Sequence, residues 1–363
     1  MGFLWEKLGR RAMFALDAET AHELGMKVLQ SGLAAPYSGL AAPYYYSDAA
    51  GFDLGPIERF GLTFPNPVGI AAGFDKNAAA VNQLASLGFG FVEVGTVTFR
   101  PQPGNPKPRM FRLPEDHALI NRLGFNNEGA GVVADRLSKL RRKGIVGINI
   151  GKNKDVPNEE ATENYLASFN LLADHADYVA INISSPNTPN LRELQRSENL
   201  DELLGALSQV ASGRVPLLVK IAPDLSEGEI ETAVDICLKY AIDGIIATNT
   251  TISRDGLRSA NVESIGAGGL SGRPLRQKAN GVIETVFRYS KGKLPIIGVG
   301  GVFTGDDAFE KIAAGASLVQ AYTGFIYGGP TFARDVNVRL AEILKEKGFS
   351  SIDEAVGTGI SAG

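Results

Sequence analysis

The stretch Val179-Ala180-Ile181-Asn182-Ile183-Ser184-Ser185-Pro186-Asn187-Thr188 begins as a β-branched strand, and Pro186 ends it. Amide and hydroxyl side chains surround the break, and the stretch contains no carboxylate, His or Cys. A strand end that presents Asn and Ser suits a flat, polar, uncharged ring better than a metal ion. We therefore predict a strand whose C-terminal end binds a small polar ligand, without a metal.

Seven similar runs lie on either side of this strand, and amphipathic segments separate them. The eight predicted strands are 68–72, 91–97, 145–150, 178–184, 216–222, 244–250, 295–300 and 318–323. The predicted helices are 77–87, 128–142, 162–175, 199–211, 227–240, 275–289, 306–314 and 333–346. Eight β-α units of this spacing predict an α/β fold, the parallel (β/α)8 TIM barrel, which takes ~250 residues. A doubly wound sheet is the alternative, but eight near-equal units favour closure.

Two connections are longer than a minimal barrel needs. Residues 99–121 form a Pro-rich excursion after the second strand, and residues 251–273 form a Gly-rich loop after the sixth. Long loops inside a compact domain usually serve binding or cover a site. Both follow the C-terminal ends of strands, where barrels carry their chemistry, so we expect both loops to contribute to the site.

Composition excludes several classes of function. The chain of 363 residues has a formal net charge of −4, which is atypical of a nucleic-acid-binding protein. One cysteine, Cys237, excludes a disulfide framework and a multi-cysteine metal site, and it lies within a predicted helix. Charged residues interrupt the first 16 positions, so they do not form a secretory signal peptide.

Two short amphipathic helices precede the barrel. The second is predicted to open with a capping box, Thr20 to Glu23. The helices either pack on the barrel as ordinary structure or form a membrane-surface or partner-binding cap, with Trp5 as an interfacial anchor. A Pro/Gly linker follows, in which residues 31–37 are repeated as residues 38–44.

The predicted strand ends present amides, hydroxyls, two lysines and glycines. Gly300-Gly301, the helix opening at Thr304 and Thr323-Gly324 together indicate a phosphate cradle, because glycines let backbone N–H groups approach an anion and a helix N-terminus adds a favourable dipole. The alternative is that these glycines only allow tight turns.

Lys220 lies inside an apolar strand and needs a reason to be there. It can form a Schiff base, as in an aldolase, or act as a fixed cation beside an electron-rich cofactor. A hydrolase triad is disfavoured because Ser185 has no nearby His or acid in sequence. From a different class, a membrane-surface scaffold without activity is disfavoured by the polar strand ends.

Five segments of the chain strongly resemble the dihydroorotate dehydrogenases. They are residues 71–76 (AAGFDK), 121–126 (NRLGFN), 149–153 (NIGKN), 184–188 (SSPNT) and 268–272 (GGLSG), they occur in the order found in the family, and the resemblance spans roughly residues 20–345. A departure is Leu123, where many relatives have an aromatic residue. A related flavin barrel that acts on another pyrimidine remains the nearest rival.

The resemblance implies an FMN-dependent barrel that oxidises (S)-dihydroorotate to orotate in pyrimidine biosynthesis. It implies that Ser185 is the catalytic base and that Lys220 stabilises the reduced flavin. The implied substrate-binding residues are Lys76, Asn121, Arg122, Leu123, Gly124, Phe125, Asn182, Asn187, Asn249 and Thr250. The implied FMN-binding residues are Ala72, Gly73, Lys76, Thr96, Asn149, Asn182, Lys220, Thr248, Gly272, Gly300, Gly301, Tyr322 and Thr323.

The resemblance also implies the subclass. Soluble class 1 members use a cysteine base, whereas Ser185 and the N-terminal helices match class 2, in which a membrane quinone reaches the flavin through the cap. His22, Arg112 and Tyr322 occupy quinone-site positions. We expect a peripheral protein on the cytoplasmic side of a bacterial inner membrane, working as a monomer. The expected organisation is a cap (1–35), a linker (36–64), the FMN-binding barrel (65–347) and a C-terminal tail (348–363).

Overall fold

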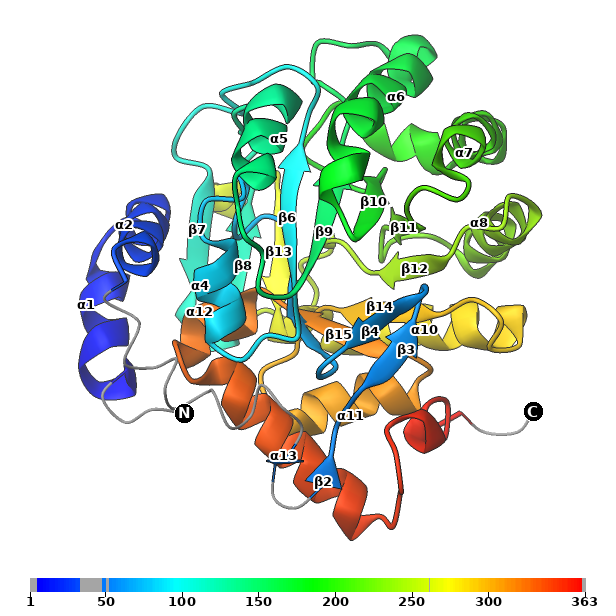
Figure 1. Cartoon of the computed structure of the whole chain (residues 1–363). Helices are drawn as coiled ribbons and strands as arrows, with labels where there is room; N and C mark the ends of the chain where they lie inside the picture. Colours follow the sequence, from blue (N-terminus) through cyan, green and yellow to red (C-terminus); the bar gives the residue numbers. More distant parts are fainter. Residues whose placement is uncertain (1–4, 33–47, 50–51, 261, 361–363) are drawn as a thin grey trace.

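The computed structural model describes residues 5–32, 48–49, 52–260 and 262–360, and its centre is a closed barrel of eight parallel strands (Figure 1). The strands of the barrel are β5 (Val68–Ile70), β6 (Phe91–Val97), β9 (Ile145–Ile150), β10 (Tyr178–Asn182), β11 (Leu217–Ile221), β12 (Gly244–Ala247), β14 (Ile296–Val299) and β15 (Leu318–Ala321). Pairing of β15 with β5 closes the ring. The predicted TIM barrel is confirmed, and each predicted strand contains one observed strand.

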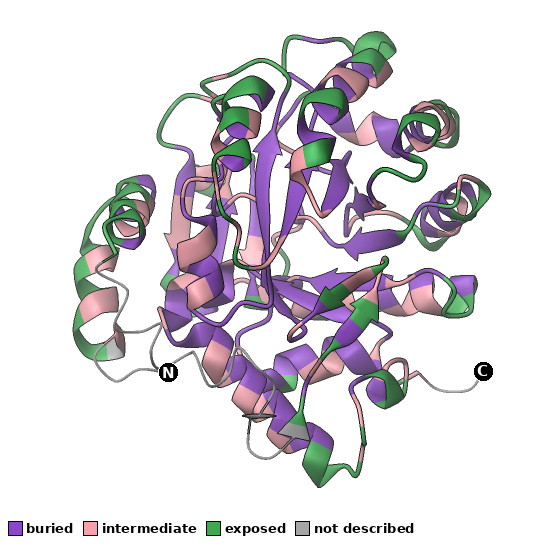
Figure 2. Ribbon diagram, in the orientation of Figure 1, coloured by how far each residue is buried: buried purple, intermediate pink, exposed green. Residues whose placement is uncertain are grey.

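Helices surround the barrel and leave its strands buried (Figure 2). They are α4 (Val81–Ser86), α5 (Ala130–Ser138), α6 (Ala161–Leu172), α7 (Ser197–Ala211), α8 (Glu227–Lys239), α10 (Arg276–Ser290), α11 (Gly305–Ala313), α12 (Thr323–Gly328) and α13 (Phe332–Glu346). Short 3-10 turns occur at η2 (Pro114–Asp116), η3 (Asn158–Glu160), η4 (Ala173–His175), η5 (Leu191–Gln195), η6 (Arg273–Leu275) and η7 (Asp353–Ala355).

The first barrel helix begins later than predicted. The prediction placed its start at residue 77, whereas α4 starts at Val81. The buried carboxylate of Asp75 accepts hydrogen bonds from the backbone N–H groups of Asn77, Ala79 and Ala80, which holds this segment as a turn. The turn keeps Lys76 beside the end of β5.

The two long connections are not separate loops. They pair with each other as an antiparallel sheet of β7 (Met110–Leu113), β8 (Ala118–Asn121) and β13 (Gly269–Gly272). Leu270 is opposite Ile120, which in turn is opposite Phe111. Together with α9 (Val262–Ile265), this sheet forms a small apolar cluster of its own, centred on Leu113, Ile120 and Leu270. Local patterns do not predict the pairing of β8 with β13 because Asn121 and its partner Gly269 are far apart in the chain, and short strands in Pro- and Gly-rich segments carry weak local signals.

The N-terminal helices lie to one side of the barrel, beside β7 and α4 (Figure 1). They comprise the π-helical turn η1 (Trp5–Gly9), α1 (Arg10–Ala15) and α2 (Ala18–Gln30). The predicted capping box at Thr20 is wrong, because α2 begins two residues earlier. Asp17 is its N-cap and accepts hydrogen bonds from the backbone N–H groups of Glu19 and Thr20. None of the described helices is long and apolar enough to cross a membrane.

The segment between the cap and the barrel is described only in part. Most of the duplicated linker, residues 33–44, lies outside the described residues. The described strands there are β1 (Asp48–Ala49), β2 (Phe52–Asp53), β3 (Ile57–Arg59) and β4 (Leu62–Phe64). At the other end of the chain, Gly357 and Gly359 donate backbone hydrogen bonds to Ile312 and Ala313, so this segment covers the end of α11.

Candidate active site

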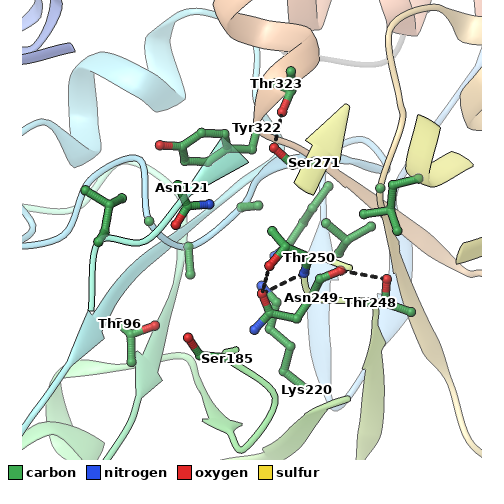
Figure 3. Close-up of a pocket in the computed structure, with 18 of the residues that line it drawn as sticks. Thr96, Asn121, Ser185, Lys220, Thr248, Asn249, Thr250, Ser271, Tyr322 and Thr323 are labelled. Carbon is green, nitrogen blue, oxygen red and sulfur yellow. Dashed lines mark hydrogen bonds between the residues drawn. The ribbon is translucent and has the colours of Figure 1, made fainter. Parts of the chain in front are cut away.

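A pocket lies at the C-terminal end of the barrel (Figure 3), and residues from four of the five segments quoted for the family resemblance meet there, all except residues 149–153. The predicted residues that line it are Ala72, Gly73, Lys76, Thr96, Asn121, Leu123, Gly124, Phe125, Asn182, Ser185, Asn187, Lys220, Thr248, Asn249, Thr250, Gly272, Gly300, Gly301, Tyr322 and Thr323. The sheet formed by the two long connections contributes Asn121, Ser271 and Gly272 to the wall.

Arg122 and Asn149 are the two predicted pocket residues that do not line it. The guanidinium of Arg122 donates to the carbonyls of Ile265 and Ala267 and stacks 4.6 Å above the ring of Phe111. It therefore fastens the 251–273 segment to β8. Asn149 is fully buried and lies behind Thr96, whose hydroxyl donates to the Asn149 amide oxygen. Both side chains support the pocket wall from outside.

Amides and hydroxyls at the ends of four strands, β6, β9, β10 and β12, form one hydrogen-bonded network. Asn182 donates to the Asn149 oxygen at 3.1 Å and to Thr96 Oγ1 at 3.0 Å. Asn249 donates to the Asn182 oxygen at 3.1 Å and to Ser184 Oγ at 3.0 Å. A network of mutually satisfied polar groups holds a rigid array of donors and acceptors, which suits a planar polar ligand.

Ser185 lies at the end of β10 and is almost fully buried, with 5% of its surface exposed. Its hydroxyl oxygen accepts a hydrogen bond from the backbone N–H of Asn187 at 3.2 Å. The Asn187 amide in turn donates to the Asn121 oxygen at 3.2 Å. Within the described part of the chain, no His or carboxylate is hydrogen-bonded to Ser185, so a hydrolase triad is absent from these residues.

Beneath the pocket lies a buried carboxylate that the sequence reasoning missed. Glu93, on β6, is fully buried and accepts hydrogen bonds from Asn149, from the Tyr178 hydroxyl at 3.0 Å and from Gln320 at 2.7 Å. Lys220 Nζ lies 3.5 Å from Glu93 Oε1. Burial and the adjacent Glu93 charge raise the pKa of Tyr178 well above its usual value. The sequence carried one signal that could have revealed it, because Glu93 is an acidic residue inside a largely apolar predicted strand.

This arrangement favours one of the two roles considered for Lys220. A Schiff-base lysine is activated in an apolar pocket or beside another cation. Lys220 instead lines the pocket with a carboxylate partner, which suits a fixed positive charge. Gln320 also lines the pocket, and its buried Oε1 has no hydrogen-bond partner among the described residues.

The glycine end of the pocket differs in one respect from the prediction. Gly300 and Gly301 have φ angles of +119° and +74°, and a Cβ at Gly301 would lie 2.5 Å from Arg276 Cβ. The turn therefore requires glycine. However, the start of α11 does not line the pocket, because a capping box of Thr304 and Asp307 occupies it. Gly300 to Val302 and Thr323-Gly324 line this end of the pocket instead.

A second cavity, of about 360 Å³, lies between the N-terminal helices and the barrel. Its lining is almost entirely apolar, and among the described residues that line it only His22 and Arg112 are ionisable. Arg112 donates to the carbonyls of Met13 and Leu16 and lies 4.7 Å from the centre of the Phe14 ring. The predicted quinone residues His22 and Arg112 thus meet in one cavity.

Three aromatic rings in contact with one another link the apolar cavity to the polar pocket. The His22 ring packs edge-on against Phe74 at 5.0 Å, and Phe74 packs edge-on against Tyr322 at 6.0 Å. Tyr322, the third predicted quinone residue, lines the polar pocket and not the apolar cavity. Burial lowers the pKa of His22 to about 3, and the nearby Lys76 charge acts in the same direction. His22 is therefore neutral at physiological pH.

A buried ion pair fixes the cap to the barrel. Arg109 on the segment leading into β7 makes a bidentate contact with Glu19 of α2, with Nη2 2.7 Å from Oε1. Burial favours the neutral form of Glu19, but Arg109 and Lys107 outweigh it, so the pKa of Glu19 lies below its usual value. Burial lowers the pKa of the neighbouring Lys76 to about 8, and the Glu19 charge opposes this shift.

Comparison with known proteins gives the same assignment from several directions. Residues 57–344 match the model of the dihydroorotate dehydrogenase family. Proteins named "Dihydroorotate dehydrogenase (quinone)" from Corynebacterium efficiens and Roseiflexus sp. are 48% and 50% identical to this chain. The alignments cover 96% of this chain and 92% of the first relative, and 97% and 98% for the second.

Solved structures agree. A ligand-free DHODH from Eimeria tenella superposes with a TM-score of 0.85 at 40% identity, over 95% of this chain and 100% of the other. The same protein in complex with ferulenol gives a TM-score of 0.83 at 39% identity, over 94% and 95% of the two chains. The chain belongs to the dihydroorotate dehydrogenase family.

Proposed function

We propose that this chain is a quinone-dependent dihydroorotate dehydrogenase that oxidises (S)-dihydroorotate to orotate and passes the electrons through FMN to a membrane quinone. One observation carries this proposal. A rigid polar pocket and an apolar cavity lie on the two sides of Phe74 and Tyr322. A single enzyme can therefore hold a water-soluble reductant on one side and a lipid-soluble oxidant on the other.

The polar pocket suits FMN. Gly300, Gly301 and Thr323 would hold the phosphate, and Lys220 would lie beside the electron-rich part of the ring. The buried Gln320 Oε1, which lacks a partner among the described residues, supplies an acceptor in the same wall. When bound, FMN supplies a two-electron carrier that takes hydride from the substrate and yields the electrons to the quinone.

Ser185 would remove the proton from the ring methylene of dihydroorotate. The backbone N–H of Asn187 points at Ser185 Oγ and stabilises negative charge that develops there. Burial of the hydroxyl excludes bulk water, which strengthens this interaction. A positioned base of this kind typically contributes about 10²–10⁴-fold to the rate.

Amides would select the substrate. Asn121, Asn182, Asn187 and Asn249 line the pocket from the ends of β8, β10 and β12 and would pair with the carbonyl, N–H and carboxylate groups of the flat ring. Lys76 adds a positive charge for the carboxylate. A site built on such hydrogen bonds rejects analogues that lack the partner groups by factors on the order of 10⁴.

The cap would bring the protein to the membrane. Leu8 and Leu24 expose 67% and 42% of their surfaces, and Leu16 and Val28 are also exposed. Apolar side chains on short surface helices bind the interface between headgroups and acyl chains. We infer a peripheral location on the cytoplasmic side of a bacterial inner membrane, residues 1–35 as the quinone-access module, and a monomeric enzyme.

A flavin experiment tests the proposal. The purified protein is made anaerobic, and its visible spectrum is recorded before and after dihydroorotate and then after a short-chain ubiquinone. We expect a flavin spectrum that bleaches with dihydroorotate and recovers with quinone. Recovery with NAD or fumarate but not with quinone would overturn the choice of oxidant. A colourless protein that cannot be reconstituted with FMN would overturn the whole proposal.

A further inference from the structure

One arginine outside the pocket fastens two of its walls together. Arg192 lies in η5, on the connection that follows β10. Its Nε donates to the carbonyl of Ser184 at 3.0 Å, and its Nη2 donates to the carbonyl of Thr250 at 2.8 Å. Arg192 itself does not line the pocket, so it contacts the walls only from behind.

Asp224, on the connection after β11, holds this arginine in place. Its Oδ2 lies 2.8 Å from Arg192 Nη1 and also accepts the backbone N–H of Ile252 at 3.1 Å. Its Oδ1 accepts from the Thr251 hydroxyl and from Lys278. The side chains of Arg192 and Asp224 are 22% and 14% exposed, so solvent screens the pair only partly.

The two carbonyls that Arg192 binds belong to functional walls. Ser184 directly precedes Ser185, and Thr250 follows Asn249, which lines the pocket after the end of β12. A planar guanidinium offers fixed donor directions, so it sets the separation of these two backbones. A misplacement of about 1 Å between a base and its substrate can cost 10²-fold in rate.

We infer that Arg192 and Asp224 form a positioning pair, which sets the distance between the Ser185 hydroxyl and the Asn249–Thr250 wall for proton removal. The pair touches neither substrate nor cofactor and acts only through the backbones of Ser184 and Thr250. This inference rests on the proposed function, because it assigns the pair to the step that Ser185 performs.

The chain contains a matched ion pair at the opposite end of the barrel. Arg142 Nη1 lies 3.0 Å from Asp177 Oδ2, and the two side chains are 29% and 27% exposed. Arg142 also donates to the carbonyl of His175, and Asp177 accepts the backbone N–H of Val146. This pair joins the starts of β9 and β10, far from the pocket, so it controls for the purely structural effect of losing a half-buried arginine.

The test compares Arg192→Met, Arg192→Lys and Arg142→Met with the wild type. For each protein we would measure FMN content, Tm, the rate of anaerobic flavin bleaching by dihydroorotate across pH, and the rate of reoxidation by a short-chain ubiquinone. Arg192→Lys keeps the charge for Asp224 but lacks the planar fork that bridges two carbonyls. Arg192→Lys therefore separates an effect on Tm from an effect of side-chain geometry on the bleaching rate.

We expect Arg192→Met to slow bleaching by about 10–100-fold while reoxidation and FMN content stay within twofold of the wild type. Arg192→Lys restores Tm but leaves bleaching slow, and Arg142→Met lowers Tm without slowing bleaching. The inference is overturned if bleaching is unchanged in both Arg192 variants, or if Arg192→Lys restores Tm and rate together. A wild type that does not bleach with dihydroorotate overturns the proposed function itself, whereas a normal wild type with unaffected variants overturns only the positioning role.

Discussion

The pocket above the barrel and the cavity under the cap helices have opposite chemistry. Amides, hydroxyls and two lysines line the pocket, whereas the described residues around the cavity include just two ionisable ones, His22 and Arg112. The pocket is made rigid by hydrogen bonds between side chains, and the cavity is enclosed by apolar packing. The difference indicates that each site accepts a ligand which the other would reject, and that Phe74 and Tyr322 mark the boundary between them.

The largest expected effect is on the half-reaction with dihydroorotate in the polar pocket. Ser185→Ala removes the proposed base, so flavin bleaching by dihydroorotate should slow by about 10²–10⁴-fold. FMN content and reoxidation of dithionite-reduced enzyme by quinone should not change, because neither depends on that hydroxyl. Stopped-flow absorbance measures both steps. Ser168→Ala, at a fully buried serine on α6, is the control. Bleaching at the wild-type rate would show that Ser185 is not the base.

The reciprocal change places a larger side chain in the apolar cavity. Ala21 is 7% exposed on α2 and lines the cavity. Ala21→Phe should slow reoxidation by quinone at least about tenfold, the effect of losing roughly 1.4 kcal/mol of binding. Bleaching by dihydroorotate should be unaffected. Ala15→Phe, at an exposed position on α1 outside the cavity, is the control. Equal loss of both half-reactions in Ala21→Phe would mean that the two sites are not separate.

A change in the proposed FMN site should affect both half-reactions equally, because both need the flavin. Gly301→Ala places a side chain at φ +74° and 2.5 Å from Arg276 Cβ. Left-handed backbone costs roughly 1–2 kcal/mol for a residue with a side chain, so FMN should bind about tenfold more weakly. Equilibrium dialysis measures the loss. Gly281→Ala, on α10 with open space around its Cβ position, should bind FMN normally. If Gly301→Ala also kept its FMN, the proposed cradle would be misplaced.

The smallest expected effect concerns the titration of His22, which lines the apolar cavity. The folded pKa of His22 is lowered to about 3 from an ordinary value of 6.5. Below pH 6.5 the unfolded chain binds a proton that the folded protein does not, so this residue's contribution to stability falls as the pH drops from 6.5 towards 3. The slope cannot exceed about 1.4 kcal/mol per pH unit for one proton.

Urea unfolding of the wild type and His22→Gln at pH 7.5, 6 and 5 measures this contribution. We expect the stability difference between the two proteins to shift in favour of the variant as the pH falls. The same difference at all three values would show that His22 titrates normally, in a cavity more open to water than its lining suggests.

The sequence predicted the barrel well because each strand is a compact β-branched run between helices of the right length. It also identified the pocket residues on the barrel strands, because residues at the C-terminal ends of parallel strands must meet. Asn121, Leu123, Gly124, Phe125 and Gly272 were expected only from the family resemblance. Asp17 was missed as a helix cap because the Thr20–Glu23 pattern competed with it. The sheet of β7, β8 and β13 could not be predicted because its pairing is non-local.

Two further features of the site were not predicted from the sequence. The interior position of Glu93 depends on the twist of the closed barrel, and the closure of the α11 N-terminus depends on the side chain of Asp307. The partners of Glu93 are distant in sequence. Asp307 closes the helix start through a capping box with Thr304.

Simultaneous binding tests the separation of the two sites most directly. Orotate and an oxidised quinone do not react with the oxidised enzyme, so both can be present at equilibrium. Isothermal titration calorimetry would measure the Kd of orotate for the FMN-loaded protein with and without a saturating short-chain ubiquinone. Two separate sites predict that the Kd changes by less than about twofold. A Kd that rises in proportion to the quinone concentration would show competition for one site and would contradict the account.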